Sequence, residues 1–314
     1  MKAFAIEEFG KPGSVRDIAV PEPGEGQVRV RVAAAGLNPF DVAVINGYLK
    51  DRMEHRFPLV PGADASGTVD AVGQGVEAWT VGDDVFGSVG KMYLGEGTLA
   101  EFATMSAATV ARKPPSLDHA AAAAVPVAGV TALNTADALA IGTGQTVVAV
   151  GATGGVGSFF VQLAARRGGR VVAVCRGENA DYARRLGAAD VIDYTAGDVV
   201  DAIRSMFPGG VDGLADMHGD REVVARLAEL VRDGGRVASV VGAADPEALA
   251  RRGIEATNVA GHVTTASLQA LAGLLEAGEI AMPEIHPFAL EDAADALVAV
   301  GTGHTRGKVV VTLA

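Results

Sequence analysis

Three glycines spaced three residues apart mark the part of this sequence where chemistry is most readily predicted. Gly151, Gly154 and Gly157 follow an apolar, β-branched run, and an amphipathic stretch, residues 156–167, comes next. Glycine lets backbone N–H groups approach an anion, and the amino end of the following helix adds a partial positive charge. The pattern predicts a turn that binds the pyrophosphate of a dinucleotide, with an ordinary strand-to-helix turn as the alternative. It departs from the common G-x-G-x-x-G spacing, because Ala152 replaces the first glycine.

The end of the next apolar run bears on which dinucleotide would bind. NAD sites usually carry Asp or Glu at this point, where the carboxylate holds the ribose 2′-hydroxyl. Here Cys175 and Arg176 occupy the place of that acid, and Glu178 follows two residues later. Arg176 would pair with a 2′-phosphate, so the sequence favours NADPH. A solvated surface arginine is the alternative.

The elements that position these residues alternate between strand and helix. Near-continuous apolar strands separated by helices are typical of a buried parallel sheet, so we expect an α/β fold with a doubly wound sheet. The expected strands are 146–150, 170–175, 191–193, 211–215 and 236–241, and the expected helices are 156–167, 180–186, 199–206 and 222–231.

The first hundred residues have a different texture. Short alternating runs such as 27–36, bounded by glycine or proline, predict a compact antiparallel β domain. One helix interrupts it, with Asn38 as its N-cap residue and Pro39 in its first position. A final strand is expected near residues 308–313.

Composition and charge exclude several classes of protein. The chain has 314 residues, enough for about two domains. Its net charge of −12 argues against nucleic acid and anionic membrane surfaces, because both attract clustered Lys and Arg. Cys175 is the only cysteine, which excludes an internal disulfide and any multi-cysteine metal site. With no signal-peptide pattern at its start, the sequence predicts a cytoplasmic protein with a small-molecule substrate.

Taken together, the motifs resemble the medium-chain dehydrogenase/reductase superfamily and, within it, the zinc-free quinone oxidoreductase branch. The stretches that carry the resemblance are "GLNPFDVAVINGYL", "FPLVPGADASGTVDAVG", "GVTALNTADALAIGTGQTVVAVGATGGVGSFFVQLA", "RRLGAADVIDY", "DGGRVASV" and "TRGKVVV", in the family's order. The resemblance implies a GroES-like β-rich catalytic domain from residues 1–124 and 261–314, with a Rossmann dinucleotide-binding domain at 125–260 between them. By analogy, a homodimer is expected.

The resemblance also bears on metal chemistry. Zinc-containing members carry Cys, His and Glu ligands at positions that correspond here to Asn38, Ala63 and Asp64. Zinc needs thiolate, imidazole or carboxylate ligands in a tetrahedral array, which these three cannot supply. The implied activity is zinc-independent hydride transfer to a quinone or an α,β-unsaturated carbonyl, whose carbonyl oxygen takes up the developing charge. An enoyl reductase of a biosynthetic pathway and a non-catalytic NADPH-binding protein remain alternatives.

Several residues acquire roles from the resemblance. Asn38 would touch the nicotinamide side of the cofactor and take part in catalysis, with a plain helix cap as its alternative. Tyr48 could bind the substrate carbonyl or pass a proton, or it is a packed surface residue. The cofactor contacts expected besides Asn38 are Thr131, Gly151, Gly154, Gly155, Val156, Gly157, Arg176, Tyr194, Val241, Gly242, Ala243 and Lys308. Tyr194 would lie by the 2′-phosphate, and Lys308 would close the cleft or only end the last strand at the surface.

Overall fold

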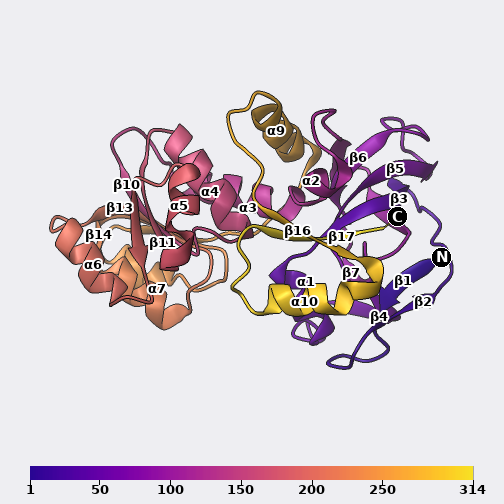
Figure 1. The fold of residues 1–314 in the computed structure, drawn as a ribbon, viewed down its shortest axis with the longest axis horizontal. Coiled ribbons are helices and arrows are strands. Elements are labelled where there is room, and N and C mark those ends of the chain that lie inside the picture. Colours follow the sequence, from indigo (N-terminus) through magenta and orange to yellow (C-terminus); the bar gives the residue numbers. More distant parts are fainter. Residues whose placement is uncertain (314) are drawn as a thin grey trace. The chain divides into compact units, whose positions relative to one another are not determined.

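The chain divides into two units, each with its own main sheet (Figure 1). The structure is a computed structural model that describes residues 1–313. Unit 1 comprises Met1–Val130, His262–Ala277 and the segment from Glu284 onward, and unit 2 comprises Thr131–Gly261 and Gly278–Pro283. The first division falls within helix α3 (Pro126–Ala138). Unit 1 is therefore built from segments on either side of unit 2 in the sequence.

Unit 2 contains a six-stranded parallel sheet. Its strands are β10 (Thr146–Val150), β11 (Arg170–Cys175), β12 (Asp190–Asp193), β13 (Val211–Asp216), β14 (Val231–Ser239) and β15 (Glu255–Asn258), and its helices are α4 (Gly155–Arg166), α5 (Ala180–Arg185), α6 (Val199–Met206), α7 (Arg221–Ala228) and α8 (Pro246–Ala250). The strand order is β12-β11-β10-β13-β14-β15, with every neighbouring pair parallel. Two three-stranded halves thus extend outward from β10 and β13, as in the doubly wound dinucleotide-binding fold. The predicted fold class is confirmed.

Apolar side chains explain why these segments form a covered sheet. All five residues of β10 and the last five of β11 are buried, as parallel strands with helices on each face require. Phe159 and Phe160 of α4 are fully buried. Burying a side chain of this size contributes roughly 1.5–3 kcal/mol relative to leaving it in water. The helix that follows the glycine turn is therefore fixed to the sheet by its own apolar face.

The strand β14 begins earlier than its sequence predicts. The expected helix 222–231 ends at Ala228, and Val231 is already in β14, where it pairs with Val211. The prediction was wrong because Val224, Leu227 and Val231 recur at helical spacing, while Val231 is in fact buried as a strand residue. After this pair, Gly213 pairs with Arg236, so the intervening residues of β14 bulge away from β13.

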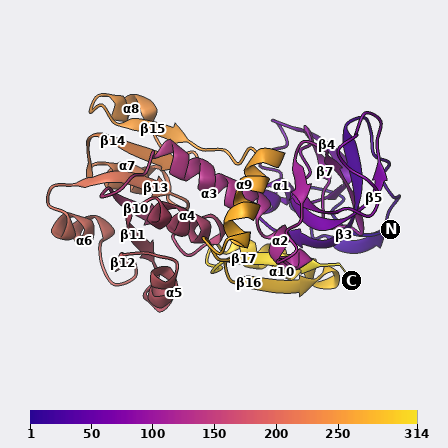
Figure 2. The same cartoon turned by 90° about the horizontal axis from the view of Figure 1, so that it is seen from above.

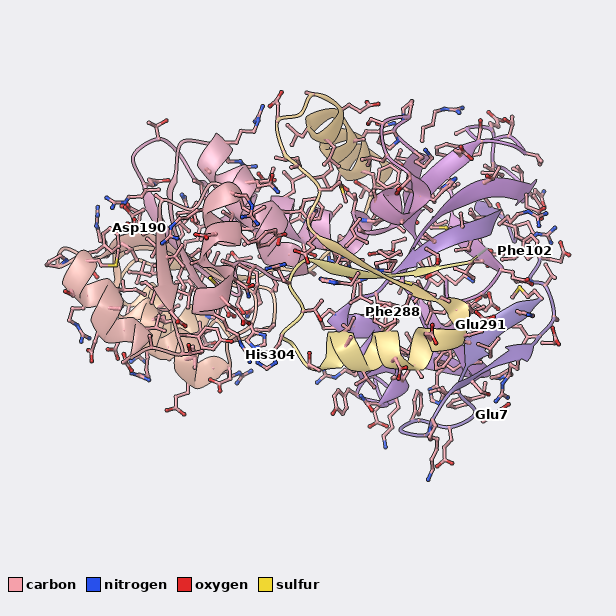
Figure 3. The ribbon with its side chains drawn as sticks, viewed as in Figure 1. Glu7, Phe102, Asp190, Phe288, Glu291 and His304 are labelled. Carbon is pink, nitrogen blue, oxygen red and sulfur yellow. The ribbon has the colours of Figure 1, made fainter. Side chains whose placement is uncertain are left out.

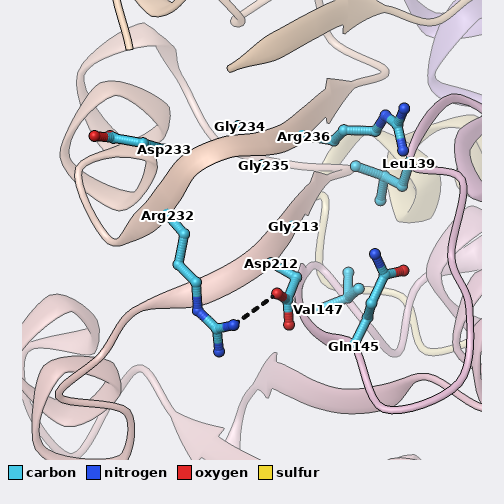
Figure 4. Close-up of a pocket in the computed structure, with 10 residues that line it drawn as sticks. All are labelled: Leu139, Gln145, Val147, Asp212, Gly213, Arg232, Asp233, Gly234, Gly235 and Arg236. Atoms are coloured by element: carbon cyan, nitrogen blue, oxygen red, sulfur yellow. Dashed lines mark ion pairs between the residues drawn. The ribbon is translucent and has the colours of Figure 1, made fainter. Parts of the chain in front are cut away.

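A pocket of about 300 Å³ lies beside this bulge (Figure 4). Gln145 and Asp212 line it from the amino ends of β10 and β13, and Arg232, Asp233 and Arg236 line it from β14. Arg232 and Asp212 form an ion pair of 2.9 Å within it. The pocket is thus at the opposite end of the strands from the glycine turn, and its charges are paired locally.

Unit 1 is a β-rich body with short helices. Its strands are β1 (Lys2–Ala5), β2 (Ser14–Asp17), β3 (Gln27–Gly36), β4 (Glu54–Val60), β5 (Asp64–Val72), β6 (Asp84–Ser88), β7 (Tyr93–Glu96), β8 (Phe102–Ser106), β9 (Val110–Arg112), β16 (Ile285–Ala289) and β17 (Lys308–Thr312), and its helices are α1 (Pro39–Ile45), α2 (His119–Ala123), α9 (Thr265–Glu276) and α10 (Ala293–Gly301). The main sheet has the order β16-β17-β3-β5-β6-β9, with β8 also paired to β3. Figure 2 shows β16 and β17, from the end of the chain, in the same unit as β3.

The strand β3 shows how unit 1 is packed. Val28, Val30 and Val32 are at most 3% exposed and belong to the core, as the alternating sequence predicts. Arg31 lies on the other face, with its guanidinium 4.7 Å from the centre of the Phe102 ring, labelled in Figure 3. One face of β3 therefore holds the core and the other carries charge.

In the part of the chain that the structure describes, no helix is long and apolar enough to cross a membrane.

Candidate functional site

The glycines form the turn between β10 and α4. Gly151 has a φ of +73°, in the left-handed region that favours glycine. Gly154 is the N-cap residue of α4 and is extended, with φ −76° and ψ −175°. Gly155, Val156 and Gly157 make the first helical turn, so their N–H groups have no partner within the helix. These N–H groups and the helix dipole together can bind an anion.

The space available at these glycines differs between positions. A Cβ atom on Gly157 would lie 2.2 Å from the Gly151 carbonyl oxygen and 2.7 Å from the Ala152 carbonyl carbon. A side chain there would push α4 away from the turn. A Cβ atom on Gly154 would meet only the Gly151 oxygen, at 3.5 Å, which is an ordinary contact. Gly157 is therefore needed for packing, whereas Gly154 leaves the outer surface of the turn open.

Arg176 and Tyr194 lie together at the carboxyl ends of β11 and β12. These strands are parallel neighbours, with Cys175 opposite Asp193. Arg176 Nε donates a hydrogen bond of 3.0 Å to the Tyr194 hydroxyl. The Arg176 side chain is 42% exposed, and its Nη1 is 4.0 Å from the Glu178 carboxylate. The structure thus joins two residues that the sequence singled out separately, and leaves much of the guanidinium open to solvent.

Two buried side chains that the sequence analysis missed hold the loops after β13 and β14. Asp216 Oδ1 accepts a 2.6 Å hydrogen bond from the Gly219 N–H group. Asp216 Oδ2 accepts one of 2.6 Å from the Ser239 hydroxyl, whose oxygen accepts another of 3.1 Å from the Ala243 N–H group. Residues 241–243, predicted to pass near the nicotinamide, are fixed in this way. The sequence signal for Asp216 was an acid at the end of an apolar strand.

Asn38 is the N-cap residue of α1, as predicted, with Pro39 in the first helical position. Asn38 and Asp41 form a capping box, in which Asp41 Oδ2 accepts a 2.8 Å hydrogen bond from the Asn38 N–H group. Both residues are buried. The Asn38 amide also makes hydrogen bonds outside the helix, with Asp64 and Lys308.

A lysine from the far end of the chain completes the surroundings of Asn38. Lys308 Nζ donates hydrogen bonds of 2.6 Å to Asn38 Oδ1 and to the Leu37 carbonyl oxygen. Asn38 Nδ2 donates one of 3.0 Å to Asp64 Oδ2, which also accepts a 3.0 Å hydrogen bond from the Val127 N–H group. Lys308 is 3% exposed, so the alternative that it ends the last strand at the surface is wrong. Asn38, Asp41, Asp64 and Lys308 are called the Lys308 cluster below.

Burial shifts the pKa of the ionisable groups in the Lys308 cluster. Burial and, to a smaller extent, the neighbouring Asp64 carboxylate raise the pKa of Asp41 to about 7, although backbone hydrogen bonds and the Lys308 ammonium oppose this. Burial raises the pKa of Asp64 to about 6, although the Lys308 ammonium opposes this. Burial lowers the pKa of Lys308, and the two carboxylates counteract that effect. One ammonium group thus lies among two carboxyl groups that are protonated more easily than in water.

The donor set around Asp64 bears on metal binding. Asp64 Oδ1 is buried and has no hydrogen-bond partner within residues 1–313, and the Ser88 hydroxyl donates a hydrogen bond of 3.1 Å to the Ala63 carbonyl oxygen. Asn38, Ala63 and Asp64, which the resemblance described above places at the positions of the family's zinc ligands, present an amide, a methyl group and one carboxylate. Across the described residues, no group of three or more His, Cys, Asp or Glu side chains is placed to hold a metal ion.

Two further predicted residues, among those that the structure describes, make no hydrogen bond to these networks. Thr131 is a buried residue of α3, and its carbonyl oxygen accepts a 2.7 Å hydrogen bond from the Thr135 hydroxyl. Tyr48 follows α1, and it is 75% exposed. Among residues 1–313, no hydrogen bond joins its phenol to Asn38 or to any other group. The phenol is accessible to a ligand but is not held in place.

A doubly wound sheet with a glycine turn, together with a β-rich unit drawn from both ends of the chain, defines the dehydrogenase type of α/β protein. Residues 24–115 match the family model described as "Alcohol dehydrogenase GroES-like domain", and residues 186–311 match the one described as "Zinc-binding dehydrogenase".

Relatives of known identity resemble nearly the whole chain. A 2-methylene-furan-3-one reductase from Solanum lycopersicum and a chloroplastic NADPH-dependent alkenal/one oxidoreductase from Arabidopsis thaliana are each 32% identical over 323 residues, covering 99% of this chain and 79% of the relative. The solved quinone oxidoreductase from Coxiella burnetii is 28% identical with a TM-score of 0.90, covering 100% of this chain and 99% of that one. The chain belongs to the medium-chain dehydrogenase/reductase superfamily, a class of oxidoreductase enzymes.

Proposed function

We propose that this protein is a zinc-independent reductase that transfers hydride from NADPH to a quinone or an α,β-unsaturated carbonyl compound. The names of the two plant relatives describe reductions of this kind, one of them with NADPH. The observation that carries the proposal is the glycine turn, where Gly157 admits no side chain and Gly154 leaves an open surface. That combination suits a helix that must pack closely while its first N–H groups face a phosphate.

The residues at the carboxyl edge of the unit 2 sheet fit the phosphates of NADPH. The N–H groups of Gly155, Val156 and Gly157 would bind the pyrophosphate. Arg176 would pair with the 2′-phosphate, since a guanidinium binds phosphate oxygens through two parallel N–H groups. Tyr194, hydrogen-bonded to Arg176 Nε, would fix that side chain in place. When bound, NADPH supplies the hydride for the reaction.

The reduction of an enone requires that the protein accommodate negative charge on an oxygen. Hydride forms a new C–H bond at the β-carbon while the electrons of the double bond move toward the carbonyl oxygen. A proton then adds at the α-carbon, which gives the saturated ketone. We assign the contact with the reacting groups to Asn38. We assign to the exposed Tyr48 phenol either a hydrogen bond to the substrate carbonyl or the donation of this proton.

Zinc independence is supported by the chemistry of the Lys308 cluster. A zinc ion at Asn38 and Asp64 would have an amide oxygen and one carboxylate as ligands, with the methyl group of Ala63 in place of a third. The amide oxygen already accepts a hydrogen bond from the Lys308 ammonium, whose charge would repel a divalent cation. In the proposed mechanism no metal ion takes part. A cytoplasmic location and a homodimer also remain proposals.

The decisive experiment measures NADPH oxidation with three acceptors in parallel: 1,4-benzoquinone, cyclohex-2-enone and a crotonyl thioester. We expect turnover with the quinone or the enone, and preference for the thioester would favour an enoyl reductase instead. A Gly154→Val variant tests whether turnover requires the glycine turn. Tight NADPH binding without turnover of any acceptor would refute the proposal and favour a non-catalytic NADPH-binding protein.

A further inference from the structure

The ammonium group of Lys308 is buried in unit 1 without a full ion pair. Its two hydrogen bonds go to neutral oxygens, the Leu37 carbonyl and Asn38 Oδ1. Asp64 and Asp41 interact with it through charge, and Asp64 is linked to it through the Asn38 amide. Burying an ammonium costs free energy unless it is well paired. Such a group in the interior calls for an explanation beyond the stability of the fold.

The consequence for Asn38 is a fixed amide orientation. An ammonium can only donate and a carboxylate can only accept, so Oδ1 must face Lys308 and Nδ2 must face Asp64. The amide oxygen is thereby held toward the Lys308 ammonium, which occupies one of its two lone pairs. One N–H bond of Nδ2 makes the hydrogen bond to Asp64, and the other has no partner among the residues described. Asn38 can therefore offer a ligand an N–H donor at Nδ2.

We propose that Lys308 is a positioning residue that orients Asn38 as a hydrogen-bond donor to the carbonyl oxygen of the hydride acceptor. The proposal rests on the proposed function and adds a role for each residue. A cation at Oδ1 withdraws electron density from the amide and strengthens its N–H donor, since hydrogen bonds in a chain polarise one another. The gain is largest for an oxygen that becomes negative during the reaction, as the acceptor's does.

Donation by Asn38 to the acceptor oxygen can be distinguished from a contact between Asn38 and the cofactor. The carboxamide of a nicotinamide gains no negative charge, so a polarised donor would bring it little benefit. The Lys308 ammonium is buried, and two of its three N–H bonds donate to Asn38 Oδ1 and the Leu37 carbonyl oxygen. We therefore expect loss of Lys308 to reduce kcat and to leave the Kd for NADPH unchanged within about twofold.

The test is a double-mutant cycle on kcat with the enone or quinone that the wild type turns over. Removing one donor to a developing oxyanion typically lowers kcat by about 10²–10³-fold, so Asn38→Ala should fall in that range. Lys308→Met should lower kcat by about tenfold or more. If Lys308 acts through Asn38, adding Lys308→Met to Asn38→Ala should cause little further loss, because residues acting as a unit are not additive. Full additivity would overturn the proposal.

Matched variants separate this role from a merely structural one. Lys113→Met removes another partly buried ammonium, which also donates to two carbonyl oxygens, at Pro114 and Leu117, and it should leave kcat unchanged. Asn38→Leu keeps the approximate size of the side chain and removes both the donor and the acceptor for Lys308. It should lose at least as much kcat as Asn38→Ala. Retained activity in a folded Asn38→Leu variant would contradict the donor role even if Lys308→Met fails to fold.

An NMR measurement in the absence of turnover tests the donor role of Asn38 without relying on kcat. Cyclohex-2-enone added to the wild type should shift the NMR signal of the Asn38 side-chain amide protons, and in Lys308→Met the shift should be much smaller. Absence of any shift in a wild type that turns over the enone would overturn the inference. A wild type that shows the shift but turns over no acceptor would instead refute the proposed function alone. Weaker NADPH binding in Lys308→Met with unchanged kcat would assign Lys308 to the cofactor.

Discussion

Valine at Gly154 and valine at Gly157 should have different effects, although the two residues lie in the same turn. A Cβ atom on Gly154 has no contact closer than 3.5 Å, and the residue is extended, so its backbone accepts any side chain. A Cβ atom on Gly157 would lie 2.2 Å from the Gly151 carbonyl oxygen. We predict that Gly154→Val folds and loses NADPH, whereas Gly157→Val loses both stability and NADPH.

The sizes of the two effects follow from this geometry. Valine at the N-cap of α4 should cost no more than about 1 kcal/mol of stability, because the glycine there makes no side-chain cap. Its bulk would cover the N–H groups expected to bind the pyrophosphate. Loss of only two charge-assisted hydrogen bonds, each worth about 1.5 kcal/mol or more, weakens binding over a hundredfold.

Valine at Gly157 requires α4 to move by roughly 1 Å, since contacts below 3.0 Å are essentially never formed by real Cβ atoms. Forced overpacking of this kind costs about 1–3 kcal/mol and sometimes more. The Tm should fall by about 2–5 °C.

The assay is titration of NADPH by fluorescence, with circular dichroism and thermal melting as the measures of folding. Gly273→Val provides a matched control, because a Cβ atom at this helical glycine of α9 would meet nothing within 4 Å and would likewise fit without strain. It should bind NADPH like the wild type. If a folded Gly154→Val bound NADPH with the wild-type Kd, the turn would be an ordinary one, and the dinucleotide site would have to be abandoned.

Three further predictions concern the cofactor, the metal and pH. Arg176→Ala should weaken NADPH binding by about 1–3 kcal/mol and leave NADH binding unchanged; a wild type with equal Kd values for the two cofactors would contradict this. Turnover should survive dialysis against a strong chelator, with no stoichiometric zinc in elemental analysis, and activity restored only by zinc would rule out the mechanism. Burial raises the pKa of Asp41 to about 7 and of Asp64 to about 6, so the folded state binds protons that the unfolded chain has released. The free energy of unfolding, measured with urea, should therefore receive a contribution that falls as the pH rises from about 4 to about 7. Asp64→Asn should reduce the dependence of the free energy of unfolding on pH, and parallel pH profiles for wild type and variant would disprove this prediction.

The sequence was most informative where local pattern and burial coincide. The expected strands 146–150 and 170–175 and the helix 199–206 have those same bounds in the structure, because a continuous apolar run is typical of a buried parallel strand and apolar residues at helical spacing are typical of a helix. It failed at Val231, whose helical spacing from Val224 and Leu227 was overruled by pairing with Val211. Periodicity cannot reveal a partner strand that lies elsewhere in the chain.

The candidate site was predictable in part for the same reason. Asn38 and Arg176 were found because each follows a strand or begins a helix, which are local signals. The hydrogen bond from Lys308 to Asn38 joins residues 270 positions apart, and no spacing in the sequence indicates it. Asp216 and Ser239 were missed because an acid and a hydroxyl at strand ends are common, and only the fold shows that they meet.

The position of β17 also has a consequence for how the protein is made. Strands are synthesised in chain order, so every strand of unit 2 has left the ribosome before β17, which supplies Lys308 and lies between β16 and β3. Unit 2 can complete its sheet during synthesis. Until β17 arrives, Asp41 and Asp64 have no cation beside them, and burying them both as carboxylates would be costly. A nascent chain can thus form its glycine turn well before the Lys308 cluster, which assembles among the last parts of the fold.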